Sequence, residues 1–190
     1  MIKPRKEIQI KRFSVDDYYK MIEAGILLEN LHEEILDGIL YEMPNSTPRK
    51  SAITSRLNEI FFTKFDDEDF LAQIYRPIRL NAFNELEPDF AFLQKCEDSY
   101  RNGHPTAKDV FLLMEISDES LEFDKTRKLP LYAEAEIQEV WIINLQSNIV
   151  ELHQRPSNGL YQFLKIFNRG EMVQSEVLPN LTLSVDEILG

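Results

Sequence analysis

The sequence predicts an α/β fold with a central mixed β-sheet. Short apolar runs typical of strands alternate with longer segments in which apolar residues recur every three or four positions, as they do on one face of a helix. The run DVFLLMEI, residues 109–116, is almost continuously apolar, as in a strand covered on both faces. The chain has no internal repeat, low-complexity segment or linker. We therefore expect one domain over residues 1–190, with residues 1–12 as a basic amino-terminal arm.

Composition excludes several classes of protein. The 190 residues are 43% hydrophobic and include 12 Phe and 7 Tyr, which is enough for a core and excludes a wholly disordered chain. No apolar run approaches the ~20 residues that span a bilayer, and the first residues lack the apolar stretch of a signal peptide. A lone cysteine, Cys96, excludes a disulfide framework and a multi-thiolate metal site. We expect a soluble, cytoplasmic protein with no membrane partner.

The formal net charge of −12 bears on nucleic-acid binding. Lys and Arg supply most of the affinity for a phosphate backbone, so an acidic chain binds nucleic acid poorly unless its cations gather on one face. Basic residues cluster within residues 3–12 and 125–128, but such clusters are commonly solvated surface. Net charge therefore leaves nucleic-acid binding open.

The amino-terminal segment predicts a helix followed by a hairpin. Ser14 and Asp17 form a capping-box pattern at the start of a helix over residues 13–24. Asp37-Gly38 separates two apolar runs within residues 33–43, which is the pattern of a β-hairpin with a two-residue turn.

Pro48 opens a second, longer helix that ends in the acidic stretch 66–69. An amphipathic pattern supports this helix, because its apolar residues fall on one stripe. The stripe consists of Ile53, Leu57, Ile60, Phe61 and Phe65.

The rest of the chain is rich in strands. Residues 71–80 read as one strand, although Pro77 suggests an edge position or a bulge. A helix is expected over residues 124–137, with Asp124 as its N-cap and an irregular start because Pro130 lacks an N–H group. Further strands are expected over residues 89–94, 109–116, 139–144, 149–154 and 160–167.

Two acids stand out against this pattern. Asp89 opens one expected strand and Glu115 closes another, so antiparallel pairing would bring the two carboxylates to one rim of the sheet. Glu115 lies in a strand so apolar that its charge needs a cation, either a side chain or a metal. Two converging carboxylates suit Mg²⁺, which keeps several waters. The alternative is that Glu115 meets a lysine and Asp89 caps a turn.

Other kinds of site find little support. His32, His104 and His153 are far apart and lack metal-ligand spacing, and the chain has no Gly-rich phosphate loop. No serine lies in a Gly-x-Ser-x-Gly elbow, and Cys96 has no histidine beside it in the sequence. A nucleophilic serine or cysteine enzyme is therefore not expected.

Three segments carry a resemblance: EEILDGILYEMP, PDFAFL and FLLMEISDESLEFDKTRKLPLYAEAEIQEVWIIN. From about Phe13 to its carboxyl end, the chain resembles the Uma-two family of "putative restriction endonucleases", which have the fold of the PD-(D/E)XK nucleases. The resemblance implies a restriction-endonuclease-like mixed β-sheet flanked by α-helices. The residues that carry it, in order, are Pro88-Asp89, Glu115-x-Ser117, Asp124-x-x-x-Lys128, Tyr132 and Trp141.

The resemblance implies a metal-dependent endonuclease that hydrolyses phosphodiester bonds, with DNA as the expected partner. Asp89 and Glu115 match the two acids of the motif, and the main-chain carbonyl of Ile116 would be a further metal ligand. Glu34 matches the upstream acid of the family and would complete the metal shell, directly or through water. The metal implied is Mg²⁺ or Mn²⁺, and a homodimer is compatible with the resemblance.

One position departs from the general nuclease motif. That motif has a lysine two residues after the glutamate, on the same face of the strand, whereas this chain has Ser117. The resemblance offers Lys128 from the following helix instead, with Lys125 in reserve. On the alternative interpretation both lysines only neutralise nearby acids. Tyr132 and Trp141 lie in apolar runs and fit core packing better than base stacking.

Three functions stay open on the sequence. The first, which we favour, is a metal-dependent nuclease acting on DNA. The second is a nuclease-fold module that has lost catalysis and serves as a binding or regulatory partner, as the acidity and Ser117 suggest. The third is a metal-dependent phosphoesterase for a smaller anionic substrate. Metal binding at Asp89 and Glu115 separates the first two, and a basic groove long enough for a duplex separates the first from the third.

Overall fold

The structure is a computed structural model that describes residues 9–28, 32–65 and 70–190. Most of the predicted basic arm, residues 1–8, and the predicted acidic helix end, residues 66–69, lie outside the described residues. None of the helices in the described part is long and apolar enough to cross a membrane.

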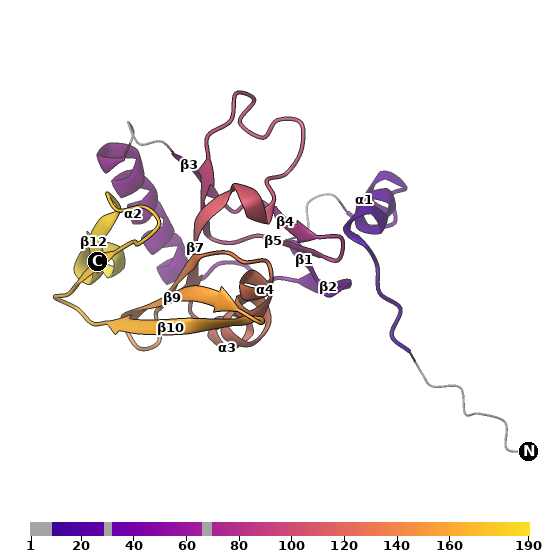
Figure 1. Cartoon of the computed structure of the whole chain (residues 1–190). Helices are drawn as coiled ribbons and strands as arrows, with labels where there is room; N and C mark the ends of the chain where they lie inside the picture. The colour runs from indigo at the N-terminus through magenta and orange to yellow at the C-terminus, as the bar shows by residue number, and fades with distance from the viewer. Residues whose placement is uncertain (1–8, 29–31, 66–69) are drawn as a thin grey trace, which may run out of the picture.

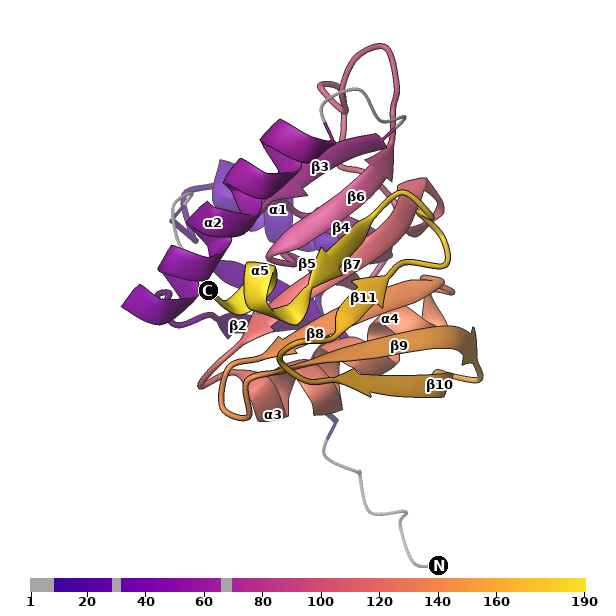
Figure 2. The same cartoon turned by 90° about the vertical axis from the view of Figure 1, so that its left-hand side faces the viewer.

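A six-stranded sheet forms the centre of the fold (Figures 1 and 2). Its strands are β3 (Phe70–Ile74), β6 (Phe90–Gln94), β7 (Val110–Ser117), β8 (Glu139–Asn144), β9 (Ile149–Ser157) and β10 (Leu160–Phe167). Their spatial order is β10-β9-β8-β7-β6-β3. Neighbours pair antiparallel except β7 and β8, which pair parallel. The predicted mixed sheet is confirmed.

A smaller sheet lies beside the central one and carries the predicted hairpin. It has the order β2-β1-β5-β4, and α1 (Val15–Glu23), capped by Ser14 as predicted, precedes it in the chain. Asp37 and Gly38 have φ angles of 52° and 73°, as a type I′ hairpin turn requires. A Cβ on Gly38 would lie 2.8 Å from the carbonyl oxygen of Phe13, so only glycine fits. The strands are β1 (Glu33–Leu36), β2 (Ile39–Glu42), β4 (Ile78–Asn81) and β5 (Asn84–Leu86).

The prediction of a single strand over residues 71–80 is wrong. The chain leaves β3 at Ile74 and enters β4 at Ile78, and these two strands belong to different sheets. Tyr75 takes a φ angle of 49° at the bend, and Pro77 has no N–H group with which to continue a ladder. The short strand β5, which pairs with β4 and β1, was not predicted.

Helices cover both faces of the central sheet, as Figure 2 shows. On one face lie α2 (Pro48–Lys64) and the terminal α5 (Val185–Leu189), which follows the small hairpin of β11 (Met172–Gln174) and β12 (Thr182–Ser184). Phe61 of α2 packs edge-on against Phe90 and Phe92, with ring centroids 5.2 and 4.9 Å apart. The other face is covered by the smaller sheet and by the helical segment that follows β7.

That helical segment is irregular, as Pro130 led us to expect. It consists of α3 (Leu121–Phe123), a π-helical turn (Asp124–Lys128) and α4 (Leu129–Glu134). The N–H group of Leu129 donates to the carbonyl of Asp124, five residues back, and Pro130 follows without an N–H group. The N-cap is Ser120, so the prediction that Asp124 caps the helix is wrong. Instead, the π turn buries both Asp124 and Lys128.

Candidate active site

Asp89 and Glu115 are brought to the same place by the antiparallel pairing of β6 and β7. Phe90 pairs with Met114, so Asp89, just before β6, lies beside the end of β7. The N–H group of Ile116 donates to Oδ2 of Asp89 at 2.6 Å. Asp89 and Glu115 are both buried, each 1% exposed. The predicted convergence of the two acids is therefore found.

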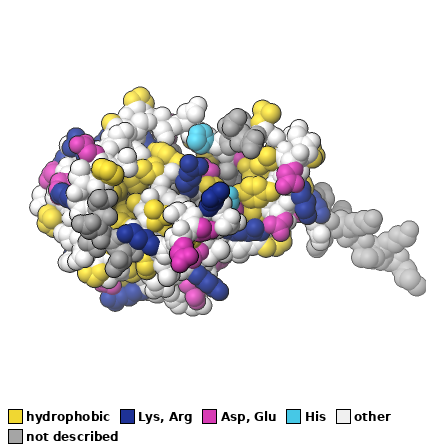
Figure 3. All heavy atoms as spheres, turned by 90° about the horizontal axis from the view of Figure 1, so that it is seen from above, with side chains coloured by type: hydrophobic (Ala, Val, Ile, Leu, Met, Phe, Trp, Pro, Cys, Tyr) yellow, Lys and Arg dark blue, Asp and Glu magenta, His cyan; other side chains and the backbone are white. Residues whose placement is uncertain are grey.

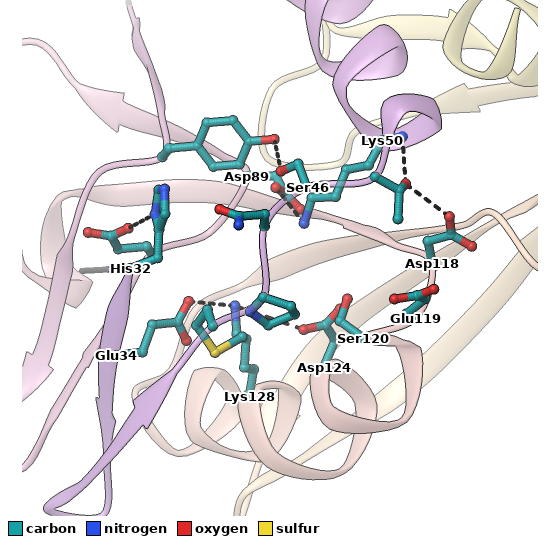
Figure 4. A pocket seen from close by; sticks show the side chains of 16 residues that line it. His32, Glu34, Ser46, Lys50, Asp89, Asp118, Glu119, Ser120, Asp124 and Lys128 are labelled. Atoms are coloured by element: carbon teal, nitrogen blue, oxygen red, sulfur yellow. Dashed lines mark hydrogen bonds and ion pairs between the residues drawn. The ribbon is translucent and has the colours of Figure 1, made fainter. Parts of the chain in front are cut away.

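Lys128 joins Glu115 to an acid from the smaller sheet. Its Nζ lies 2.8 Å from Oε1 of Glu34, 3.3 Å from Oε1 of Glu115 and 3.8 Å from Oδ1 of Asp124. Figure 4 shows Lys128 rising from the helical segment between Glu34 and Asp124. The structure thus places Lys128 and Glu34 together with Glu115, as the resemblance implied.

Ser117 faces the same side of β7 as Glu115, because side chains alternate along a strand. Its hydroxyl donates to Oδ2 of Asp124 at 2.8 Å, and the hydroxyl of Ser120 donates to the same oxygen at 2.7 Å. At the position that carries lysine in the general motif, this chain therefore has a hydrogen bond to the segment that carries Lys128.

Lys50 is a member of the site that we did not predict. It lies in the first turn of α2, after the N-cap Thr47, and its Nζ is 2.8 Å from Oδ1 of Asp89. Asp89 thus has a donor on each oxygen. A signal did exist in the sequence, because Lys50 precedes Ile53 and Leu57 by three and seven positions and so lies on the apolar stripe of the helix.

Tyr132 is fully buried, as predicted for a core residue, but it also contacts the site. Its hydroxyl donates to Oε1 of Glu115 at 2.6 Å. Trp141 is buried as well, and its indole N–H donates to Glu139, away from the acid pair. Only the tyrosine therefore acts on the candidate catalytic acids.

Lys125 belongs to a different cluster. Its Nζ lies 2.8 Å from Oε2 of Glu151 on β9, and Asn144 donates to the other oxygen at 3.0 Å. Burial alone would raise the pKa of Glu151, but the contacts of its carboxylate with His153, Lys125 and Asn144 lower it to about 2. The reserve role that the sequence offered to Lys125 therefore has no geometric support.

Burial dominates the electrostatics of the site. It raises the pKa of Glu34 and Asp89, and it raises the pKa of Glu115 to about 8, against the attraction of Lys128. Burial alone would lower the pKa of Lys128, but Glu115, Glu34 and Asp124 raise it well above its ordinary value. Desolvation contributes more to these raised pKa values than the mutual repulsion of the acids does.

These residues border a pocket of about 390 Å³ (Figure 4). Glu115 is not a lining residue, but it contacts the lining residue Lys128 at 3.3 Å. Lys50 and Lys128 are the cations of the lining, and hydroxyl groups come from Ser46, Thr47, Tyr75 and Ser120. The carboxylates of the lining are Glu34, Glu87, Asp89, Asp118, Glu119 and Asp124.

The carboxylates of the site are the candidate ligands for a divalent metal. Within the described ranges, no three His, Cys, Asp or Glu side chains already form a ligand group, and Lys50 and Lys128 occupy oxygens of the acids. The chemistry of the donors nevertheless suits a hard cation, because all are oxygens. Oε2 of Glu34 is also buried without a hydrogen-bond partner in the described structure. These residues fit Mg²⁺ or Mn²⁺ once the ammonium groups shift.

A mixed sheet with helices on both faces, and two acids where adjacent strands meet, define a protein of restriction-endonuclease-like fold. The model of the Uma2 family, described as "Putative restriction endonuclease", matches residues 15–186, and the chain belongs to this family. The resemblance seen in the sequence is thereby confirmed.

One solved structure illustrates the likeness. It is described as a putative nuclease belonging to DUF820 from Anabaena variabilis ATCC 29413, with a TM-score of 0.75 and 16% identity. The likeness covers 93% of this chain and 97% of that one, and at this identity it shows the fold alone. No curated protein matches the chain.

Proposed function

We propose that this protein is a metal-dependent endonuclease that hydrolyses phosphodiester bonds in DNA. The observation that carries the proposal is the meeting of Asp89 and Glu115 at one end of an antiparallel strand pair, with Glu34 and Lys128 against them. Membership of a family described as restriction endonucleases supports the class of reaction.

The charge of the cluster supports a divalent metal. Glu34, Asp89, Glu115 and Asp124 face two ammonium groups, those of Lys50 and Lys128, so ionising all four acids leaves two negative charges unbalanced. Mg²⁺ or Mn²⁺ would be held by Asp89, Glu115, Glu34 and the carbonyl of Ile116. Such an ion supplies Lewis-acid polarisation of the phosphate and charge compensation.

The chain's own residues would hold these ligands in place. The N–H group of Ile116 orients Asp89, and the hydroxyl of Tyr132 orients Glu115. Lys128 would take the place of the motif lysine by holding positive charge beside Glu115. Donors that are already oriented reduce the reorganisation that the reaction requires.

A second candidate is a phosphoesterase for a small anionic substrate. The pocket is of small-molecule size, about 390 Å³, and the rim carboxylates Glu87, Asp118 and Glu119 would repel a long polyanion. On the face seen in Figure 3, Lys and Arg side chains are interspersed with Asp and Glu rather than joined in one basic band.

A third candidate is a binding module without catalysis. Lys50 and Lys128 already neutralise the acids that would hold the metal, and Ser117 stands in place of the motif lysine. Such a module would keep the fold and its ion pairs without responding to metal.

The test is cleavage of plasmid DNA, single-stranded DNA and RNA with Mg²⁺ or Mn²⁺. We expect metal-dependent cleavage that Asp89→Asn lowers by at least ~10²-fold, as loss of one transition-state contact does elsewhere. Asp98→Asn is the matched control, because Asp98 is an exposed carboxylate in the loop after β6. Cleavage restricted to a small diester such as bis-p-nitrophenyl phosphate favours the second candidate, and no cleavage under any metal favours the third.

A further inference from the structure

We propose that Lys50, rather than Lys128, is the cation that contacts a phosphate oxyanion of the substrate in this pocket. The inference rests on the proposed function, since it assumes a phosphodiester or phosphate ester as the ligand. It assigns substrate contact to the helix α2, which the motif does not include.

Lys128 is already engaged by buried acids. Its ammonium group donates to Glu34 at 2.8 Å and to Glu115 at 3.3 Å, and the carboxylate of Asp124 lies 3.8 Å away. Its side chain is only 4% exposed. Lys128 therefore balances the charge of the buried acids and positions Glu115.

Lys50 is placed differently. Its side chain is 19% exposed and lines the pocket, and Asp89 is the one carboxylate recorded within ion-pair distance among the described residues. Figure 4 shows Lys50 reaching from the end of α2 toward Asp89. A cation that occupied Asp89 would compete with the ammonium group, which could then turn to an oxyanion in the pocket.

The surroundings of Lys50 also suit an anion. The helix α2 has 17 residues, and its first turn, with the N-cap Thr47, borders the pocket, so the positive end of the helix dipole lies there. The hydroxyl of Tyr75 lies 3.5 Å from that of Ser46 and 3.0 Å from that of Thr54. The hydroxyl of Thr54 already donates to the carbonyl of Lys50, so the hydroxyls of Ser46 and Tyr75, which line the pocket, are the ones that could donate to the same oxyanion as Lys50.

Tyr75 itself is held in an uncommon conformation. Its φ angle of 49° is rare for a bulky residue, and strain of this kind concentrates at functional sites. The side chain of Tyr75, like that of Lys50, lines the pocket. Lys50, Ser46 and Tyr75 all line this pocket, and we name these three residues the phosphate subsite.

The experiment measures binding without cleavage. A fluorescent single-stranded DNA oligonucleotide is titrated with Ca²⁺ as the divalent ion, at constant salt, for the unmutated protein and variants. Lys50→Ala should weaken binding about 10-fold or more, as loss of a charge-assisted hydrogen bond predicts, and Lys50→Arg should retain part of the affinity. Lys64→Ala is the control, since Lys64 lies at the other end of α2, pairs with Glu187 and is 47% exposed.

A second pair of variants guards against misfolding. Removing Lys50 alone leaves Asp89 buried without its cation, which could unfold the protein. Lys50→Met in an Asp89→Asn background removes that unpaired charge, and comparison with Asp89→Asn alone isolates the effect of the lysine. The double variant should bind the oligonucleotide about 10-fold more weakly than the single variant.

The outcomes separate this inference from the proposed function. Binding that depends on Lys50 in a protein that cuts nothing supports the phosphate subsite and refutes the nuclease. Normal binding and normal cleavage after Lys50→Ala refute the subsite and leave the nuclease standing. Equal losses for Lys50→Ala and Lys64→Ala indicate general surface charge and overturn the inference. A protein that neither binds nor cuts DNA overturns both.

Discussion

The hydroxyl of Ser117 donates a 2.8 Å hydrogen bond to Oδ2 of Asp124, and the other oxygen of that carboxylate lies 3.8 Å from Nζ of Lys128. The strand position that carries lysine in the general motif is thus linked through Asp124 to a lysine of the helical segment. Positive charge still lies beside Glu115, but it comes from a helix rather than from the strand.

The inference that Lys128 supplies the positive charge that position 117 lacks can be tested directly. Ser117→Lys alone should destabilise the fold, because a second ammonium group would be buried where Ser117 is 0% exposed. Adding Lys128→Met should recover part of the stability and of any cleavage activity, since one cation then remains. Urea unfolding and cleavage assays measure both. A double variant that is less stable than either single variant would contradict this role of Lys128.

Lys128 should matter for stability as well as for activity. Lys128→Met leaves three buried carboxylates without their cation, and breaking a buried ion pair in this way costs about 3–5 kcal/mol of unfolding free energy. Lys125→Met should cost less than this, because that lysine is 38% exposed and buried Glu151 keeps its hydrogen bond from Asn144. Equal costs in urea unfolding would mean that Lys128 is not the charge-balancing residue.

Tyr132→Phe removes the hydroxyl that donates to Glu115. We expect a loss of about 1 kcal/mol near pH 6 and about 2 kcal/mol above pH 8, because hydrogen bonds to a charged acceptor are stronger. Tyr161→Phe is the control, since its hydroxyl donates to the carbonyl of Ile137, which does not titrate. The prediction fails if both variants lose the same stability at every pH.

Stability should fall as pH rises from about 5 to about 8. Burial raises the pKa of Glu115 from 4.5 to about 8, so over that interval the unfolded chain releases a proton that the folded protein keeps. The contribution of Glu115 to stability is complete below pH 4.5. It is lost as the pH rises through about 8, the pKa of Glu115 in the folded protein. Glu34 and Asp89 shift in the same direction.

Glu115→Gln should flatten this pH dependence, as urea unfolding across the interval would measure. Glu187→Gln should leave it unchanged, because hydrogen bonds from Lys64 and Ser184 lower the pKa of Glu187 to about 2, which places its effect below pH 4.5. A slope in Glu115→Gln equal to that of the unmutated protein would show that Glu115 is ionised in the fold.

Millimolar Mn²⁺ should raise the melting temperature, because it binds only the folded state, by about 2–4 °C for each kcal/mol of binding. The rise should be larger near pH 8 than near pH 6, since the metal competes with protons for the buried acids. Asp89→Asn should abolish the response and Asp98→Asn should keep it. A melting temperature that does not change with Mn²⁺ at either pH would favour the binding module.

The sequence by itself determined the features that depend on near neighbours. The cap at Ser14, the turn at Asp37-Gly38 and the irregular helix around Pro130 follow from local backbone chemistry. The sequence also indicated the meeting of Asp89 and Glu115, because antiparallel pairing places the start of one strand beside the end of its neighbour.

The tertiary structure alone decided which cation meets which acid. Lys128 pairs with Glu34 across 94 positions, and Lys50 reaches Asp89 from the first turn of α2. The break at Tyr75 that separates β3 from β4 was equally unforeseen. Local patterns specify where a charge is buried, but the partner of a buried charge depends on which elements pack against it, and packing is a property of the whole fold.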